Sequence, residues 1–300
     1  MMTARLLALN GATVILACRS MKNGNAAALD IMREIQKFEA ANRKKTSASP
    51  GTVNAMELDL SDLRSVRSFV TDFSKTYGKL DILINNAGIA TSLKGGPKKT
   101  VQGVRIVFGT NFVGPFALTL LLLDLLKASS AGRIVNLSSV MHRFASRDVT
   151  TALDGPGNPR GYADSKLAML LFTRELRRRL AGTRVVATAA NPGFVASDIW
   201  RHFHAVPALG ALWRAACAVV ALTVEQGAAV SAAAAAAPPP ASDDDALYLQ
   251  PYPLPLGWAL PFEMAGPFVG PRAARPALPA DEPAQSRELW RRCEALLAAS

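Results

Sequence analysis

Leu80-Asp81-Ile82-Leu83-Ile84-Asn85-Asn86-Ala87-Gly88 is a short apolar stretch that ends in two amides and a glycine. Its apolar residues do not alternate with polar ones, which is typical of a strand buried on both faces of a sheet. Residues 133–139 and 185–193 have the same form and also end in polar side chains or glycine. The sequence therefore predicts an α/β protein with a doubly wound parallel sheet.

The alternation of strand and helix continues on both sides of these stretches, up to about residue 200. We therefore predict one domain, with a core at residues 1–200 and an extension of the same domain at residues 201–300. Ser61 is a candidate N-cap of one helix. The other expected strands lie at residues 12–18 and 53–58, and the expected helices at residues 23–41, 101–127 and 161–180.

Tyr162 and Lys166 lie four residues apart, and therefore one turn apart on the same face of the helix expected at residues 161–180. A phenol has a pKa of about 10 and exchanges protons poorly at neutral pH. A neighbouring ammonium group favours the phenolate and lowers that pKa. The pair suits general acid–base chemistry at a carbonyl or an alcohol, although its spacing alone also fits a pair on a helix surface.

The polar groups that follow the apolar stretches support the chemical interpretation, because open α/β sheets bind ligands at the carboxyl ends of their strands. In chain order they are the amides after residue 84, Asn111 at the start of a leucine-rich helix, the hydroxyls of Ser138 and Ser139, and then the tyrosine–lysine pair. This order resembles the short-chain dehydrogenase/reductase family, closely over residues 2–200. The resemblance implies a Rossmann-like fold and hydride transfer between a nicotinamide dinucleotide and an alcohol/carbonyl pair.

The resemblance assigns a role to each residue of this set. Tyr162 is expected to be the catalytic acid/base, Lys166 to lower its pKa and hold the nicotinamide ribose, and Ser139 to bind the substrate oxygen. Asn111 is expected to complete a proton relay through water. The other residues expected at the cofactor are Asn85, Asn86, Ala87, Gly88, Pro192, Gly193, Val195 and Ser197, with Asp59 at the adenine.

The residues after the strand at 12–18 choose between NAD and NADP. An acidic side chain there binds the ribose diol, whereas a basic side chain accepts the 2′-phosphate. Arg19 follows Cys18 directly, and its planar guanidinium suits a phosphate, with Lys22 as a candidate helper. We therefore predict NADP, with NAD as the less favoured cofactor.

Members of this family begin with a strand and a glycine-rich turn, whose backbone N–H groups bind the pyrophosphate. Here residues 3–9 carry apolar side chains three and four apart and Gly11 follows, which predicts the end of a helix instead. We therefore expect the first strand to be missing. Either the true start lies upstream, or this is a short form that is misfolded, inactive or completed by a partner.

The net charge of +11 arises from 34 Lys and Arg residues against 23 Asp and Glu residues. These charges are scattered and no nucleic-acid-binding motif accompanies them, which predicts no nucleic-acid partner and an affinity for an anionic cofactor or membrane surface. The three cysteines have no metal or disulfide spacing, so we expect no metal and a reducing compartment. The expected location is the cytoplasm or the periphery of a membrane, with an anchor in any upstream segment left open.

The extension contains a stretch rich in Trp, Phe and Leu at residues 199–222, where the family usually builds its substrate lid. Such a lid suits a lipophilic substrate or contact with a membrane surface, although a simple packing helix fits nearly as well. The Glu-Gln-Gly-Ala segment at residues 225–228 and the wide separation of Ser139 from Tyr162 resemble the retinol dehydrogenase-like branch. Other expectations are a disordered loop at residues 238–245, an irregular segment at residues 251–279 and a terminal helix at residues 286–297.

Together these features predict an NADP-dependent oxidoreductase that acts on a small-molecule carbonyl or alcohol, retinoid-like or steroid-like in character. The alternative is an inactive truncated form that acts as a non-catalytic binding or regulatory protein. A homodimer through the leucine-rich helix at residues 116–126 is a further expectation.

Overall fold

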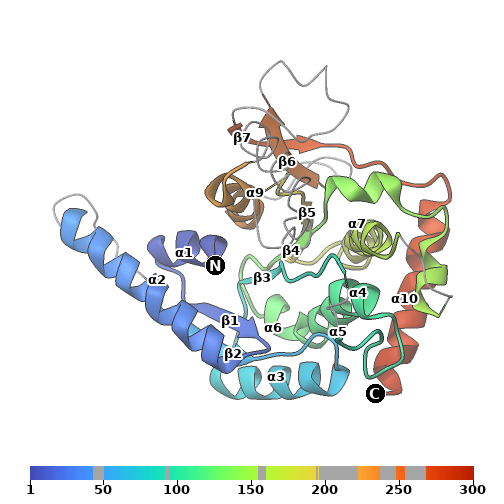
Figure 1. Ribbon diagram of the computed structural model, residues 1–300, viewed down its shortest axis with the longest axis horizontal. Helices are drawn as coiled ribbons and strands as arrows, with labels where there is room; N and C mark the ends of the chain where they lie inside the picture. Colours follow the sequence, from blue (N-terminus) through green and yellow to red (C-terminus); the bar gives the residue numbers. More distant parts are fainter. Residues whose placement is uncertain are drawn as a thin grey trace. The chain divides into compact units, whose positions relative to one another are not determined.

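The computed structural model describes residues 1–42, 51–91, 95–154, 160–193, 195, 222–236, 248–253 and 268–300. The chain forms two compact units, Met1–Asp59 and Leu60–Ser300, and each unit has its own sheet (Figure 1). Elements from before and after residue 200 both belong to the second unit. The division expected at residue 200 and the missing first strand stay predictions.

The first unit is built on two parallel strands, β1 (Val14–Cys18) and β2 (Val53–Glu57). The helices α1 (Met2–Leu9) and α2 (Met21–Asn42) pack with these strands, so the helix expected before Gly11 is confirmed. Gly11 has a φ of +88°, a left-handed value that suits glycine at the end of a helix. The buried core of this unit consists of Ala8, Ala28, Ile31, Ile35 and Val53.

The second unit contains a five-stranded sheet with the order β3-β4-β5-β6-β7. The strands predicted from the three apolar stretches are confirmed as β3 (Ile82–Asn85), β4 (Arg133–Leu137) and β5 (Val186–Ala190), and all three are parallel. The parallel ladder aligns their carboxyl ends along one edge of the sheet. The polar residues that follow each strand are therefore brought to the same edge.

The prediction of an irregular segment at residues 251–279 was partly wrong, because two strands enter this region. β6 (Tyr248–Pro253) pairs in parallel with β5, and β7 (Phe268–Ala274) pairs antiparallel with β6. The prolines are tolerated because β7 lies at the end of the strand order and the register shifts between Pro251 and Pro253. A proline has no N–H to donate, so edges and irregularities are where strands accept it.

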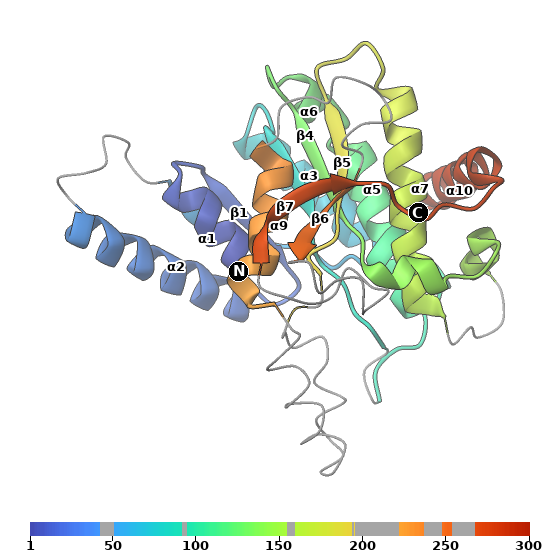
Figure 2. The same cartoon turned by 90° about the horizontal axis from the view of Figure 1, so that it is seen from above.

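Helices cover both faces of this sheet. Figure 2 shows α9 (Val224–Ala236) on one face, and α5 (Gly114–Leu121) and α7 (Gly161–Arg179) on the other. Asp62, not Ser61, caps α3, because its carboxylate accepts a hydrogen bond from Arg64 N at 3.0 Å. The remaining helical elements are α3 (Leu63–Thr76), α4 (Ile106–Phe108), the π-helix η1 (Gly109–Val113), α6 (Leu123–Lys127), the 3₁₀-helices η2 (Val140–Phe144) and η3 (Val149–Leu153), and α10 (Glu282–Ala298).

The C-terminal helix α10 packs against α7 and α5 through aromatic rings. The Phe116 and Trp290 ring centres lie 5.2 Å apart, and Phe172 lies within 5.8 Å of Trp290. Phe116 is only 1% exposed, so the start of the leucine-rich segment is already covered within the chain. The homodimer through this segment stays a prediction. Of the helices in the described part of the chain, none is both long and hydrophobic enough to span a bilayer.

Candidate active site

Tyr162, Lys166 and Ser139 come together where β4 ends and α7 begins. Tyr162 is in the first turn of α7, and the Nζ atom of Lys166 lies 5.6 Å from the centre of its ring. A side-chain hydrogen bond joins Ser139 to Tyr162. Ser139 also caps η2, because its Oγ accepts a hydrogen bond from Met141 N at 3.3 Å. A phenol, a hydroxyl and an ammonium group therefore share one site.

Burial controls the pKa values of the tyrosine–lysine pair. It raises the pKa of Tyr162 to about 12, although the hydrogen bond with Ser139 acts in the opposite direction. Burial also lowers the pKa of Lys166 to about 8. Lys166 is 4% exposed, and its Nζ donates a hydrogen bond to Leu137 O at 3.0 Å. Desolvation therefore dominates the pKa of Tyr162 in the protein alone, and the expected lowering of this pKa by Lys166 stays a prediction.

Asn111 connects the segment after β3 with the start of α7. Its Oδ1 accepts a hydrogen bond from Ile89 N at 2.8 Å, and its Nδ2 donates to Ile89 O at 2.9 Å and to Ser165 Oγ at 3.0 Å. Ser165 Oγ donates in turn to Tyr162 O at 2.7 Å. Asn111 thus fixes the backbone beside the phenol. Its expected part in a proton relay stays a prediction.

Gly88 leaves the approach to Asn111 and Lys166 open. A Cβ atom at this position would lie 3.5 Å from both Lys166 Nζ and Asn111 Oδ1. Any larger side chain would therefore occupy the space in front of these two polar groups. Asn86 and Ala87 precede it in the same loop after β3.

Asn85 belongs to a buried chain of side-chain hydrogen bonds that sequence reasoning only partly found. Its Nδ2 donates to Thr119 Oγ1 at 2.9 Å and to Asn136 Oδ1 at 2.7 Å, and Asn136 Nδ2 donates to Thr173 Oγ1 at 2.9 Å. These bonds tie β3 and β4 to α5 and α7. Asn136 was detectable in principle, because it is a polar residue inside an apolar strand.

The segment after β5 is held by the conformation of Gly193. Its φ is +79°, and a Cβ atom there would lie 2.7 Å from Leu222 Cδ1 and 2.8 Å from Pro251 Cγ. Gly193 N donates to Asn191 Oδ1 at 3.0 Å, and Val195 forms a parallel bridge with Leu222. Only glycine fits this turn. Ser197, and nearly all of the stretch expected to form the lid, lie outside the described residues.

Arg19, Lys22 and Asp59 belong to the first unit, and the catalytic set belongs to the second. Arg19 is exposed directly after β1, Lys22 is exposed in the first turn of α2, and neither forms an ion pair with another described residue. Asp59 is half-buried after β2. Their roles at the cofactor stay predictions.

Asp164 is a buried residue that sequence reasoning did not single out. Its carboxylate accepts hydrogen bonds from Ser146 N at 2.7 Å and from Ser146 Oγ at 3.2 Å. Burial raises its pKa, and the bonds from Ser146 oppose that shift. Asp164 therefore ties the insert between Ser139 and Tyr162 to α7.

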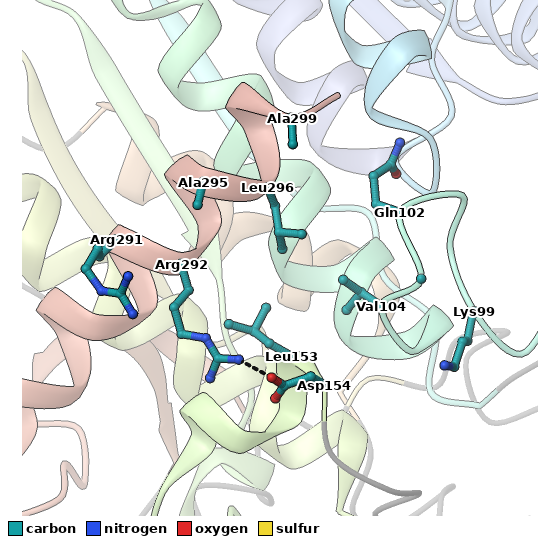
Figure 3. A pocket seen from close by; sticks show the side chains of 11 residues that line it. Lys99, Gln102, Val104, Leu153, Asp154, Arg291, Arg292, Ala295, Leu296 and Ala299 are labelled. Atoms are coloured by element: carbon teal, nitrogen blue, oxygen red, sulfur yellow. Dashed lines mark hydrogen bonds and ion pairs between the residues drawn. The ribbon is translucent and has the colours of Figure 1, made fainter.

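A pocket of about 500 Å³ lies beside α10, and its lining includes none of the catalytic set. Arg292 donates to Asp154 across this pocket (Figure 3), and Arg291 pairs with Glu288 at 2.7 Å. Both guanidinium groups are thus engaged within the protein. The pocket adds nothing to the chemistry of the candidate site.

Comparison with known proteins places this geometry in a family. The short chain dehydrogenase pattern matches residues 2–206. Retinol dehydrogenase 12 of Mus musculus is 42% identical over 217 residues, which cover 71% of this chain and 62% of that protein. Dehydrogenase/reductase SDR family member 13 of Bos taurus is 43% identical over 207 residues, which cover 67% of this chain and 50% of that protein. A solved structure of an uncharacterised protein from Mycobacterium paratuberculosis is 30% identical, has a TM-score of 0.64, and is matched over 99% of this chain and 88% of that one.

The chain belongs to the short-chain dehydrogenase/reductase family. Its similarity to retinol dehydrogenases places it in the retinol dehydrogenase-like branch. The Rossmann-like fold expected from the sequence is confirmed. The matched part of the chain spans 50–62% of the length of the two curated relatives described above.

Proposed function

We propose that this protein is an oxidoreductase that transfers a hydride between NADP(H) and an alcohol/carbonyl pair. The observation that supports this function best is the meeting of Tyr162, Ser139 and Lys166 at one site. Two hydroxyl groups joined by a hydrogen bond can both reach a single substrate oxygen. A binding protein has no need for a buried ammonium group beside that pair.

The protonation states of the site suit carbonyl reduction. With a pKa of about 12, Tyr162 is a protonated phenol at neutral pH and can donate its proton to a carbonyl oxygen that is becoming an alkoxide. Ser139 can donate a hydrogen bond to the same oxygen. Oxidation requires the phenol to lose a proton, which positive charge beside it favours. The nicotinamide, when bound, supplies or accepts the hydride.

The residues on the second unit fit the nicotinamide end of such a cofactor. Lys166 has three N–H donors, and Leu137 O accepts only one of them, which leaves two for ribose hydroxyls. The absence of a side chain at Gly88 keeps the approach to Lys166 open. Tyr162 and Lys166 would therefore hold the ribose, with Pro192 and Gly193 beside the ring.

NADP is the proposed form of the cofactor, because Arg19 directly after β1 and Lys22 in the first turn of α2 are exposed cations. A guanidinium group can form two hydrogen bonds with a phosphate and has no comparable partner in the ribose diol of NAD. Arg19→Asp should reverse the preference between NADPH and NADH in a fluorescence titration. A variant that still binds NADPH more tightly than NADH contradicts the role of Arg19.

The proposed substrate is a lipophilic aldehyde or alcohol, retinoid-like or steroid-like. Two observations support this class: the similarity to retinol dehydrogenases and the stretch rich in Trp, Phe and Leu after the nicotinamide loop. All-trans-retinal is therefore the first carbonyl to assay, with a small polar aldehyde as its comparison. Faster turnover of the polar aldehyde would contradict this substrate class.

Tyr162→Phe tests the function itself. Loss of a general acid typically costs 10²–10⁴-fold in rate, so retinal reduction should fall by at least about 100-fold while NADPH still binds. Tyr77→Phe is the matched control, because Tyr77 packs on Phe73 away from the catalytic set and should leave the rate unchanged. Turnover within tenfold of wild type in Tyr162→Phe would overturn the proposal. A wild-type chain that binds no NADPH would favour the non-catalytic alternative.

A further inference from the structure

His142 is a buried histidine that the catalytic scheme does not use. It lies in η2, three residues after Ser139, and is 2% exposed. Its Nδ1 lies 2.6 Å from Ser139 O, and its Nε2 lies 3.2 Å from Ala277 N. The ring of Tyr248, in β6, lies edge-on at 5.7 Å between ring centres. The imidazole therefore connects the catalytic serine to the segment after β7.

The two contacts fix the tautomer of the imidazole. Ala277 N is a backbone donor, so Nε2 must be the acceptor of that hydrogen bond. The proton of a neutral imidazole then lies on Nδ1, which donates it to Ser139 O. The ring is thus a bridge with a defined donor end and a defined acceptor end.

The donor end acts on the residue whose hydroxyl faces Tyr162. Ser139 O accepts hydrogen bonds from His142 N at 3.0 Å and from His142 Nδ1 at 2.6 Å, and Ser139 has extended backbone angles of φ −161° and ψ 156°. Two donors on one carbonyl hold this peptide plane in place. A fixed backbone restricts the rotamers of Ser139, and the hydrogen bond from Met141 N to its Oγ at 3.3 Å also holds the hydroxyl, so the Oγ stays within reach of the phenol.

We propose that His142 is a positioning residue for Ser139, and that its Nδ1–H donor orients the serine hydroxyl for the substrate oxygen. This inference rests on the proposed function. The bridge also makes the segment around Ala277 part of the support of the active site, although that segment is far from Ser139 in the sequence. Small errors in the placement of a catalytic group cost large factors in rate, which is why such a support matters.

Two substitutions at His142 each remove one of the two hydrogen bonds of the bridge and can keep the other. In His142→Asn, the amide nitrogen can take the place of Nδ1 and keep the donor to Ser139 O, while the acceptor for Ala277 N is lost. In His142→Gln, the longer amide can place its oxygen near Nε2 and keep the acceptor, while the donor is lost. Retinal reduction should keep its kcat within about threefold in His142→Asn and fall by at least about tenfold in His142→Gln, with similar melting temperatures and NADPH affinities.

If His142 were only a structural tie, the two variants would both lose activity, each in proportion to its loss of stability. Equal kcat values for the Asn and Gln variants would therefore overturn the proposal. If His142→Gln does not fold, His142→Asn decides alone, and a tenfold fall in its kcat refutes the role of the donor.

A double-substitution cycle gives a second readout. If His142 acts through the Ser139 hydroxyl, adding His142→Gln to Ser139→Ala should cause little further loss of kcat. Losses that multiply would refute the coupling. A wild-type chain without turnover would refute the proposed function, and this inference with it. An active wild type with an unaffected His142→Gln would refute this inference alone.

Discussion

Lys166 is a charged group that the fold has taken almost completely out of water. Its ammonium has one backbone acceptor and no carboxylate partner among the described residues, so desolvation is offset only in part. Such an arrangement destabilises the protein and is retained where chemistry needs a charge. The buried position of Lys166 is therefore a cost in stability, as expected if Lys166 has the proposed role.

Lys166→Met should stabilise the protein near pH 7. The pKa of Lys166 is about 8 in the folded state, against an ordinary value of 10.5. The cost of burying the charge is therefore complete below pH 8 and disappears as the pH rises towards 10.5. Removing the buried charge should stabilise the folded state by about 3 kcal/mol, and losing the hydrogen bond to Leu137 O should destabilise it by about 1 kcal/mol. The net gain in stability at pH 7 is therefore about 2 kcal/mol.

Urea unfolding at pH 7 and at pH 10 measures this gain. The advantage of the methionine variant should shrink at the higher pH, and Lys98→Met, at an exposed lysine, should show almost no effect at either pH. A methionine variant that is less stable than wild type at pH 7 would contradict a desolvated ammonium.

Among single residues, the sequence indicated which candidate catalytic side chains would lie together, but not their protonation states. Tyr162 and Lys166 have a recognisable spacing on one helix, and Ser139 follows an apolar strand. The pKa of Tyr162 could not be predicted, because it depends on how tightly distant segments enclose the phenol. His142 in η2 and Asp164 in α7 escaped for a similar reason: a lone polar residue gives no sign in the sequence of which distant backbone group it will bind.

Among elements, α10 is held by a carboxylate–guanidinium cluster as well as by aromatic packing. The side chain of Glu282 is 8% exposed, and its Oε2 lies 2.8 Å from Arg178 Nη2 and 3.4 Å from Arg174 Nε. Ser286 Oγ donates to the same carboxylate at 2.7 Å. The cluster fixes the beginning of α10 on α7, whose own end is rich in arginine.

Glu282→Gln and Glu288→Gln should differ although they make the same change on one helix. Glu282 is buried and contacts Arg178, Arg174 and Ser286 at once, so removing its charge weakens the whole cluster and we expect a loss of about 1–3 kcal/mol. Glu288 is 42% exposed and pairs with the exposed Arg291 at 2.7 Å, so solvent screens the pair and its loss should be much smaller than that of Glu282. Thermal unfolding of the two variants tests this order, which equal losses would contradict.

The sequence predicted most helices from their periodicity, and the parallel strands from continuous apolar stretches that end in polar residues or glycine. It missed β6 and β7 because their prolines argue against a strand, and the edge position of β7 together with the register shift between Pro251 and Pro253 makes them acceptable. The choice of Ser61 over Asp62 as the N-cap was wrong by one residue, since both side chains can cap and only the local backbone decides.

At the scale of the whole molecule, the net charge of +11 should act on any anionic ligand. The Debye length falls from about 10 Å at 0.1 M salt to about 3 Å at 1 M, so long-range attraction is screened over that range. NADPH binding, measured by fluorescence, should therefore weaken several-fold between these salt concentrations. Binding of uncharged retinal should not weaken, and an NADPH affinity independent of salt would contradict a role for the overall charge.

The geometry of the candidate active site depends on the number of residues in the π-helix η1. Gly114 N donates to Gly109 O, five residues back, where an α-helix would span four. Each residue of an α-helix advances the chain by about 100°, so deleting one residue from this wide turn would rotate Asn111 relative to the phenylalanines that follow it. The site is therefore sensitive to chain length here, and a deletion that leaves every named side chain in the sequence would still dismantle it.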